Sequence, residues 1–150
     1  MTATSASSEL ERLTPFLGAW DTDGLIRATG VGDASSFRVV DTYERLPGGH
    51  FLVHRVDANM PEGRAQGIEI IGYSRDRGDH PMHAFDSTGL ASVIRARVEQ
   101  DTRTFLGDSL RFTGRFRDNG RTFDGTCEMR SVDGSSWQPW MDVTLKRASS

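Results

Sequence analysis

The chain has 150 residues, 36% of them hydrophobic and 26% charged, and its formal net charge is −3. A chain of this length can bury about 70% of its unfolded surface in one domain, so we expect a single domain over residues 1–150. The acidic balance argues against nucleic-acid binding, and no apolar run approaches the length of about 18 residues that a membrane span needs. The first residues lack the charged and apolar regions of a signal peptide, so we expect a cytoplasmic protein with no nucleic-acid or membrane partner.

The N-terminal region predicts one helix. Residues 1–8 are polar and are expected to form a mobile tail. From Glu9 to Leu17, leucines recur at helical spacing, which predicts a short helix with one apolar face.

After Gly18 the pattern changes to strict alternation, in short segments that end at turn residues. The dipeptides Asn119-Gly120 and Asp133-Gly134 are strong signals for tight hairpins. Strands are expected near residues 19–29, 36–46, 50–58, 65–74, 81–87, 90–100, 102–107, 109–118, 121–131 and 137–147. About ten strands joined mostly by tight hairpins are typical of an antiparallel up-and-down barrel, which leaves no free sheet edge. The predicted fold class is therefore all-β, a ten-stranded barrel with a short N-terminal helix.

The alternation also predicts which side chains face the barrel interior. Leu110, Phe112 and Phe116 share one face of their strand, and arginines occupy the other face. On the next strand, Phe123 and Cys127 share a face, with charged and polar residues opposite. We expect both apolar sets to point inward.

The two ends of the chain carry a further pattern. Gly18-Ala19-Trp20 opens the first predicted strand directly after the helix, and Arg147 ends the last strand. In a closed up-and-down barrel these two strands are neighbours. We therefore expect Trp20 to be buried at the helix-covered end, with the Arg147 guanidinium across its indole ring.

At these residues the sequence resembles the calycin superfamily of lipocalins, fatty-acid-binding proteins and nitrobindin-like barrels. It is most similar to small uncharacterised bacterial calycin-like proteins of about this length. The segments that carry the resemblance are LGAWDTDG, YERLPGGHFLVHR, GIEIIGYSRDRGDHPMHAFDSTG and WQPWMDVTLKR. The resemblance covers nearly the whole chain and implies a barrel around a ligand cavity. It does not imply one substrate, because this architecture hosts many functions.

A cavity of this kind is expected to bind a small, largely apolar organic molecule. The candidate ligand-binding residues are chosen because they are aromatic or share a strand face with apolar neighbours. They are Trp20, Tyr43, His54, Tyr73, His83, Phe85, Phe112, Phe116, Trp137 and Trp140.

Two other functions stay open at this point. A cofactor-independent enzyme, such as a cyclase or isomerase of a hydrophobic metabolite, needs an acid–base pair, and Asp41, His54 and His83 are the first suspects. Asp41 shares a face with Phe37 and Val39, so it lies either inside the barrel with a partner or in solvent near a strand end. A homodimer joined through barrel faces is the other alternative, and it requires a contiguous apolar patch on the outside.

The sequence predicts no metal site and no cofactor. His50 and His54, four residues apart on one strand, are separated by about 13 Å, too far to chelate one metal ion. Haem-binding nitrobindin-like barrels keep a histidine just before the last strand, and Trp140 occupies that place here. An indole nitrogen has no usable lone pair for iron, so haem ligation is not expected. Trp137 and Trp140 are expected either to pack at the rim or core, or to form an aromatic wall for an organic ligand.

Overall fold

The structure, a computed structural model, describes residues 6–28 and 32–148 of the chain. Helix α1 (Ala6–Leu10) leads into the 3-10 helix η1 (Glu11–Phe16), and strands follow. The strands are β1 (Gly18–Ile26), β2 (Ser35–Arg45), β3 (Leu52–Met60), β4 (Gly63–Ile71), β5 (His80–Asp86), β6 (Ala91–Glu99), β7 (Thr102–Leu106), β8 (Leu110–Arg117), β9 (Thr122–Arg130) and β10 (Trp137–Arg147).

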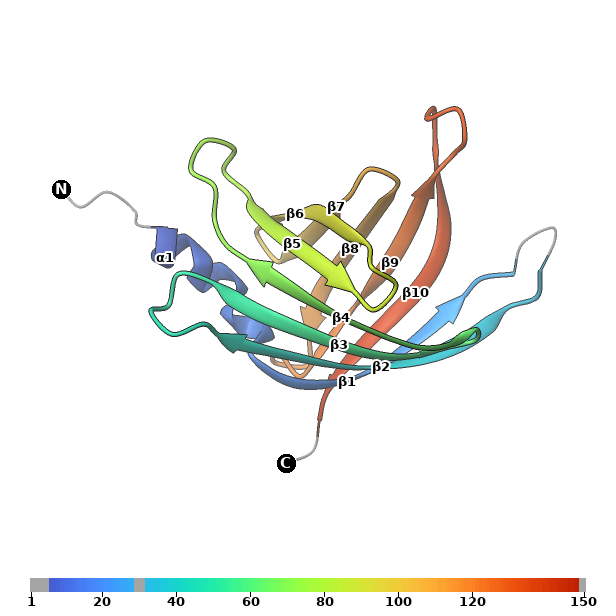
Figure 1. Ribbon diagram of the computed structural model, residues 1–150, viewed down its shortest axis with the longest axis horizontal. Coiled ribbons are helices and arrows are strands. Elements are labelled where there is room, and N and C mark those ends of the chain that lie inside the picture. The colour runs from blue at the N-terminus through green and yellow to red at the C-terminus, as the bar shows by residue number, and fades with distance from the viewer. Residues whose placement is uncertain (1–5, 29–31, 149–150) are drawn as a thin grey trace.

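The ten strands form one closed antiparallel barrel (Figure 1). Each strand pairs with the next one along the chain, and β10 pairs with β1 to close the sheet. Each strand end lies within three residues of the end that the sequence predicts, although residue 29, the predicted end of the first strand, lies outside the described residues. The predicted fold class is confirmed.

The helical segment differs from its prediction. Residues 6–8, assigned to a mobile tail, belong to α1, and residues 1–5 of that tail lie outside the described residues. The second half of the segment is a 3-10 helix containing Pro15, whose ring removes a backbone donor and disfavours a continued α-helix. In the described part of the chain, no helix has the length and apolar character needed to cross a membrane.

The turn between β8 and β9 shows why tight hairpins suit this sequence. Asp118 and Asn119 both adopt positive φ values, 55° and 54°, and Gly120 follows with φ of 80°. Asp, Asn and Gly tolerate this left-handed conformation better than other residues do. The turn therefore reverses the chain direction within a few residues, and Phe116 pairs directly with Phe123 across the two strands.

One end of the barrel is filled by apolar side chains from the helical segment, here called the plug: Leu10, Leu13 and Phe16, each at most 3% exposed. Phe16 contacts the rings of Phe116 and Phe123, at 4.8 Å between centroids in each case. The plug therefore occupies the same end of the barrel in which the first strand begins (Figure 1).

Trp20 and Arg147 hold the plug to the closing strands. Trp20 is fully buried and donates its indole N–H to the Phe16 carbonyl at 2.7 Å. The Arg147 guanidinium carbon lies 4.3 Å from the centre of the Trp20 ring, as the sequence predicts. The same guanidinium donates hydrogen bonds to the carbonyl oxygens of Pro15 and Leu17, which end the helical segment. One side chain thereby joins the last strand, the first strand and the plug.

Replacing Trp20 with alanine is expected to lower the free energy of unfolding by about 3–5 kcal/mol, because it opens a large void between the plug and the sheet. The matched control is Trp137→Ala, which removes an indole that lies between Arg111 and Arg130 and should cost only about 1 kcal/mol. Urea unfolding followed by far-ultraviolet circular dichroism measures both. Equal losses in the two variants would contradict the assigned role of Trp20.

Candidate functional site

Beyond Phe16, the barrel interior contains a cavity of about 300 Å³, here called the central cavity. Its apolar wall is formed by side chains from most of the strands: Phe37, Val39, Val56, Met82, Ile94, Phe105, Leu110, Phe112, Phe123, Cys127, Trp140, Met141, Val143 and Leu145. Gly24 allows the ring of Phe37 to lie against β1, because a Cβ at Gly24 would come within 2.0 Å of that ring. The residues that line the cavity therefore belong to the strands and to η1 rather than to loops.

A second hollow of about 380 Å³ adjoins the central cavity. The two spaces share Val56, Glu69, Ile94 and Leu110. The second hollow extends along β3 toward Met60, at the hairpin farthest from the plug. A bound molecule can therefore extend from the central cavity toward the open end of the barrel.

One wall of the cavity is polar. Thr22, Asp41, His54 and Glu69 come from the consecutive strands β1, β2, β3 and β4, and together they are called the polar wall here. Thr22 donates its hydroxyl to Asp41 Oδ2 at 2.5 Å, and His54 Nε2 lies 2.7 Å from Asp41 Oδ1. His54 Nδ1 bonds to Glu69 Oε1. The register of the sheet brings the set together, since His54 pairs directly with Glu69 across β3 and β4.

The geometry indicates that His54 carries both ring protons. Each ring nitrogen faces a carboxylate oxygen, and an ionised carboxylate can only accept a hydrogen bond. Burial by itself lowers the pKa of an imidazole, but here the hydrogen bonds and charges of Asp41 and Glu69 outweigh it and raise the pKa of His54 to about 9. The Tyr43 ring stacks on the imidazole at 4.0 Å between centroids and 6° between planes. His54 is therefore a fixed imidazolium at neutral pH.

The structure places four of the predicted ligand-binding residues on the central cavity: Tyr43, His54, Phe112 and Trp140. Asp41 lies inside with a partner, so the alternative of a solvated position near a strand end is wrong. Burial, followed by the charges of Asp41 and Glu69, raises the pKa of Tyr43 well above its usual value, so its hydroxyl keeps its proton.

Two further predicted residues lie inside the barrel but away from the cavity. Trp20 and Phe116 contact each other and the plug, with 6.2 Å between their ring centroids. Both share the inward face with the cavity residues, but the plug fills the space next to them. The expectation that Trp20 and Phe116 line the cavity is therefore wrong. Alternation predicts which side chains face inward, but it does not predict how far the helical segment reaches into the barrel.

Four predicted residues lie outside the cavity altogether. His83 and Phe85 are exposed on the outer face of β5, and Tyr73 packs against His80 beyond the end of β4. Trp137 lies between two arginines, Arg111 and Arg130. For β5 the face assigned from the sequence was wrong: Met82 lines the cavity, which turns His83 and Phe85 outward.

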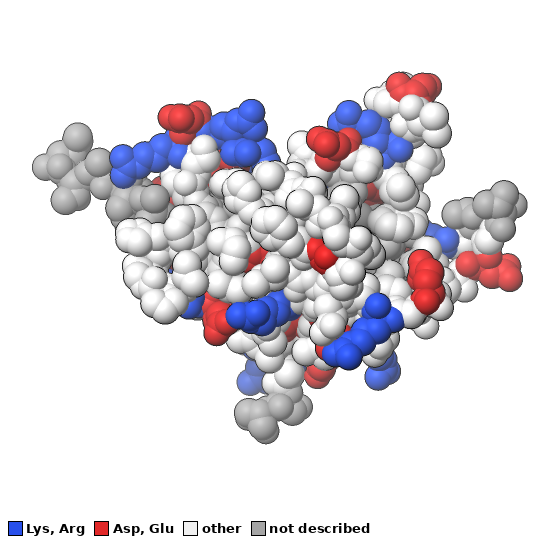
Figure 2. Space-filling model, in the orientation of Figure 1, with Lys and Arg blue, Asp and Glu red and all other residues white. Residues whose placement is uncertain are grey.

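Outward-facing side chains of β4, β5 and the start of β6 form an apolar patch, which is bordered by Arg64 on β4 and by Arg95 and Arg97 on β6. Ile68 pairs with Phe85, and Val93 lies across from His83. Phe85 is 52% exposed and Val93 45% exposed. Figure 2 shows few charged side chains over β4 and β5. This surface is compatible with the predicted homodimer, which stays a prediction.

Thr22 and Glu69 complete the polar wall, and neither is among the site residues predicted from the sequence. Glu69 stands between Ile68 and Ile70 in the apolar second half of β4, two residues before Ile71, and the side chains of Glu69 and Ile71 both point inward. A charged residue at an inward position was the available signal, but it needs the register of β4, which the sequence alone did not fix. The aliphatic lining residues were missed because candidates were chosen mainly by aromatic character.

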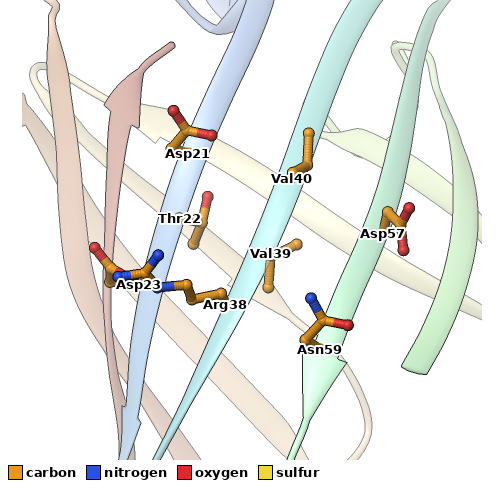
Figure 3. A pocket seen from close by; sticks show the side chains of 8 residues that line it. All are labelled: Asp21, Thr22, Asp23, Arg38, Val39, Val40, Asp57 and Asn59. Carbon is orange, nitrogen blue, oxygen red and sulfur yellow. Dashed lines mark ion pairs between the residues drawn. The ribbon is translucent and has the colours of Figure 1, made fainter. Parts of the chain in front are cut away.

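A further hollow of about 400 Å³ lies over the outside of β1, β2 and β3 (Figure 3). Asp21, Asp23 and Asp57 border it, and Arg38 forms an exposed ion pair with Asp23 at 3.3 Å. These charges are solvated, and exposed pairs of this kind contribute little energy. The outer hollow is therefore a less suitable binding site for an apolar organic ligand than the central cavity.

The cavity residues do not fit haem. Trp140 lines the cavity, and its indole offers no lone pair for iron. His54 is the histidine that lines the cavity, and both of its ring nitrogens are engaged by carboxylates. Within residues 6–28 and 32–148, no cluster of three or more His, Cys, Asp or Glu side chains is arranged to hold a metal ion.

Comparison with known proteins agrees with this fold. A family model described as "Protein of unknown function (DUF1579)" matches residues 5–147. The chain belongs to the DUF1579 family. Its structure is similar to the crystal structure of Rv2717c from M. tuberculosis, with a TM-score of 0.67, 16% sequence identity, and coverage of 94% of this chain and 98% of that chain. At this identity the similarity shows a shared fold alone. No curated protein matches this DUF1579 chain significantly.

The polar wall predicts a pH dependence of stability. The pKa of His54 is raised on folding, so its contribution is complete below about pH 6.5 and is lost as the pH rises to about 9. Over this window the free energy of unfolding should fall by an amount on the order of 3 kcal/mol or less. Urea unfolding at several pH values measures the slope.

The His54→Gln variant should lose this slope, because glutamine does not titrate. The control is His50→Gln, an exposed histidine in the loop between β2 and β3, which should keep the slope of the unmodified protein. A full slope in the His54→Gln protein would contradict the imidazolium assignment.

Proposed function

We propose that this protein binds a small, largely apolar organic molecule in the central cavity. The observation that carries the proposal is an interior space of about 300 Å³ with one polar wall and otherwise apolar walls. Ligand sites in proteins are typically concave and mostly apolar, with a few convergent polar groups that orient the ligand. The closed ten-stranded barrel with a plugged end also supports the inferred kinship with calycins.

The geometry favours binding over catalysis. The acid–base catalysis considered for this cavity needs a group that accepts or releases a proton near neutral pH. His54 is held as an imidazolium between two carboxylates, and Asp41 already accepts two hydrogen bonds. His83, the third suspect, lies on the outer face of β5. The suspected acid–base pair is therefore a fixed ion cluster, which suits orientation of a ligand.

Filling the cavity should abolish binding. Val39 lines the central cavity, whereas its neighbour Val40 is 50% exposed on the outer face of the same strand. Nile red, an uncharged dye that fluoresces in apolar surroundings, should bind the unmodified protein. Its affinity should fall at least about tenfold in Val39→Phe, because the added ring occupies the space of the dye.

Val40→Phe is the matched control and should bind the dye normally. Because Val40 borders the outer hollow, loss of binding in Val40→Phe alone would move the site to the outside of the barrel. Absence of dye binding by the unmodified protein would remove the proposal.

Haem should not bind specifically to the unmodified protein. Titration with haem is expected to give no sharp Soret shift and no one-to-one endpoint, because neither Trp140 nor His54 offers a free nitrogen lone pair. The variant Trp140→His introduces such a nitrogen on the cavity wall and should gain haem affinity. Tight one-to-one binding by the unmodified protein, abolished by His54→Gln, would contradict this expectation.

A further inference from the structure

The charged groups of the central cavity lie on one side. The polar wall belongs to β1, β2, β3 and β4, whereas β5 to β10 contribute no charged residue and, as hydrogen-bonding groups, only the Trp140 indole N–H and the Cys127 thiol. Among the described residues that line the cavity there is no arginine or lysine. A ligand that fills this space therefore meets charged groups along one edge only.

The polar wall has no hydrogen-bond donor to spare. The Thr22 hydroxyl donates to Asp41, and the two N–H groups of His54 donate to Asp41 and Glu69. Among the hydrogen bonds between described residues, His54 engages Glu69 through Oε1, and none reaches Oε2. Glu69 is also the most accessible of the three charged groups, with 15% of its side chain exposed. The wall therefore offers the ligand an acceptor.

The charges of the wall do not cancel. Asp41 and Glu69 bring two negative charges, and the imidazolium of His54 brings one positive charge. One net negative charge remains beside an apolar space, where charges are poorly screened and costly to leave unpaired. A group that compensates it must be a cation, and a cation that also donates a hydrogen bond satisfies both requirements.

We propose, as an extension of the ligand-binding function above, that the ligand is a small amphiphilic amine whose protonated head donates to Glu69 Oε2. Its apolar body lies against the aromatic and aliphatic wall and reaches toward the adjoining hollow. Glu69 lines both spaces, so a head bound there leaves room for the body on either side.

The same geometry disfavours an acidic amphiphile. A carboxylate head would meet the net negative charge of the polar wall. Outside that wall the lining offers it uncharged donors, the Tyr43 hydroxyl and the Trp140 indole N–H, and the weakly donating Cys127 thiol. A neutral alcohol can donate to Glu69 but leaves the charge uncompensated. The expected order of affinity is therefore amine, then alcohol, then carboxylate.

Competition against Nile red at neutral pH tests the order, with octylamine, octanol and octanoate as three probes that differ only in the head group. Octylamine should displace the dye at a concentration at least about tenfold lower than octanoate. In Glu69→Gln, the preference for octylamine over octanoate should shrink at least about tenfold, and octanol should change little.

The matched control is Glu44→Gln, which makes the same change of charge at an exposed position on β2. It should keep the preference, which separates a specific contact from attraction by the overall negative charge. If Glu69→Gln does not fold, the order of affinity of the three probes for the unmodified protein still tests the preference for an amine head group.

Each other outcome has a distinct meaning. Octanoate competing as well as octylamine would overturn the inference about the head group and leave the cavity as a binding site. Equal loss of preference in the two glutamate variants would also overturn it. Dye binding that no probe displaces would overturn this inference and leave the proposed function standing, whereas no dye binding at all would overturn both.

Discussion

The pairing of the first strand with the last is the constraint on which the molecule depends. It is fixed where Trp20 pairs with Arg147, and the Arg147 guanidinium covers the indole ring while it binds the carbonyl oxygens that end the helical segment. Closure leaves the sheet without a free edge. It also directs one face of every strand toward a common interior, which the plug fills at one end and leaves hollow beyond Phe16.

Within that interior the polar wall has an energetic role besides the recognition role proposed for it. Burying three charged side chains costs free energy unless each is paired and hydrogen-bonded. The strands supply those partners at fixed positions, because His54 lies between Asp41 on β2 and Glu69 on β4. An ion cluster held by a rigid sheet changes little when a ligand enters, so it suits selection among head groups better than proton transfer.

The sequence predicted the positions of the strands correctly, because turn residues and alternation are local signals. It misled where the two faces of one strand have similar composition. Turn residues and alternation located all ten strands within three residues of their ends. On β5, however, both faces carry apolar side chains: Met82 faces inward and Phe85 outward. Alternation without a clear polar face cannot tell inside from outside, and His83 was therefore assigned to the wrong side. Trp20 was predicted to line the cavity because the pattern along a strand does not show how far from the end of the barrel the cavity begins.

What the sequence by itself determined is the all-β class, the order of strands, and the contact of Trp20 with Arg147 at the plugged end, since these follow from period, turn chemistry and the closure of an up-and-down barrel. Only the tertiary structure decided the site. Successive members of the polar wall, Thr22, Asp41, His54 and Glu69, are 19, 13 and 15 residues apart along the chain. They meet because the register of four neighbouring strands aligns them. Register is a property of paired strands, and a shift of one residue would turn any of these side chains to the solvent.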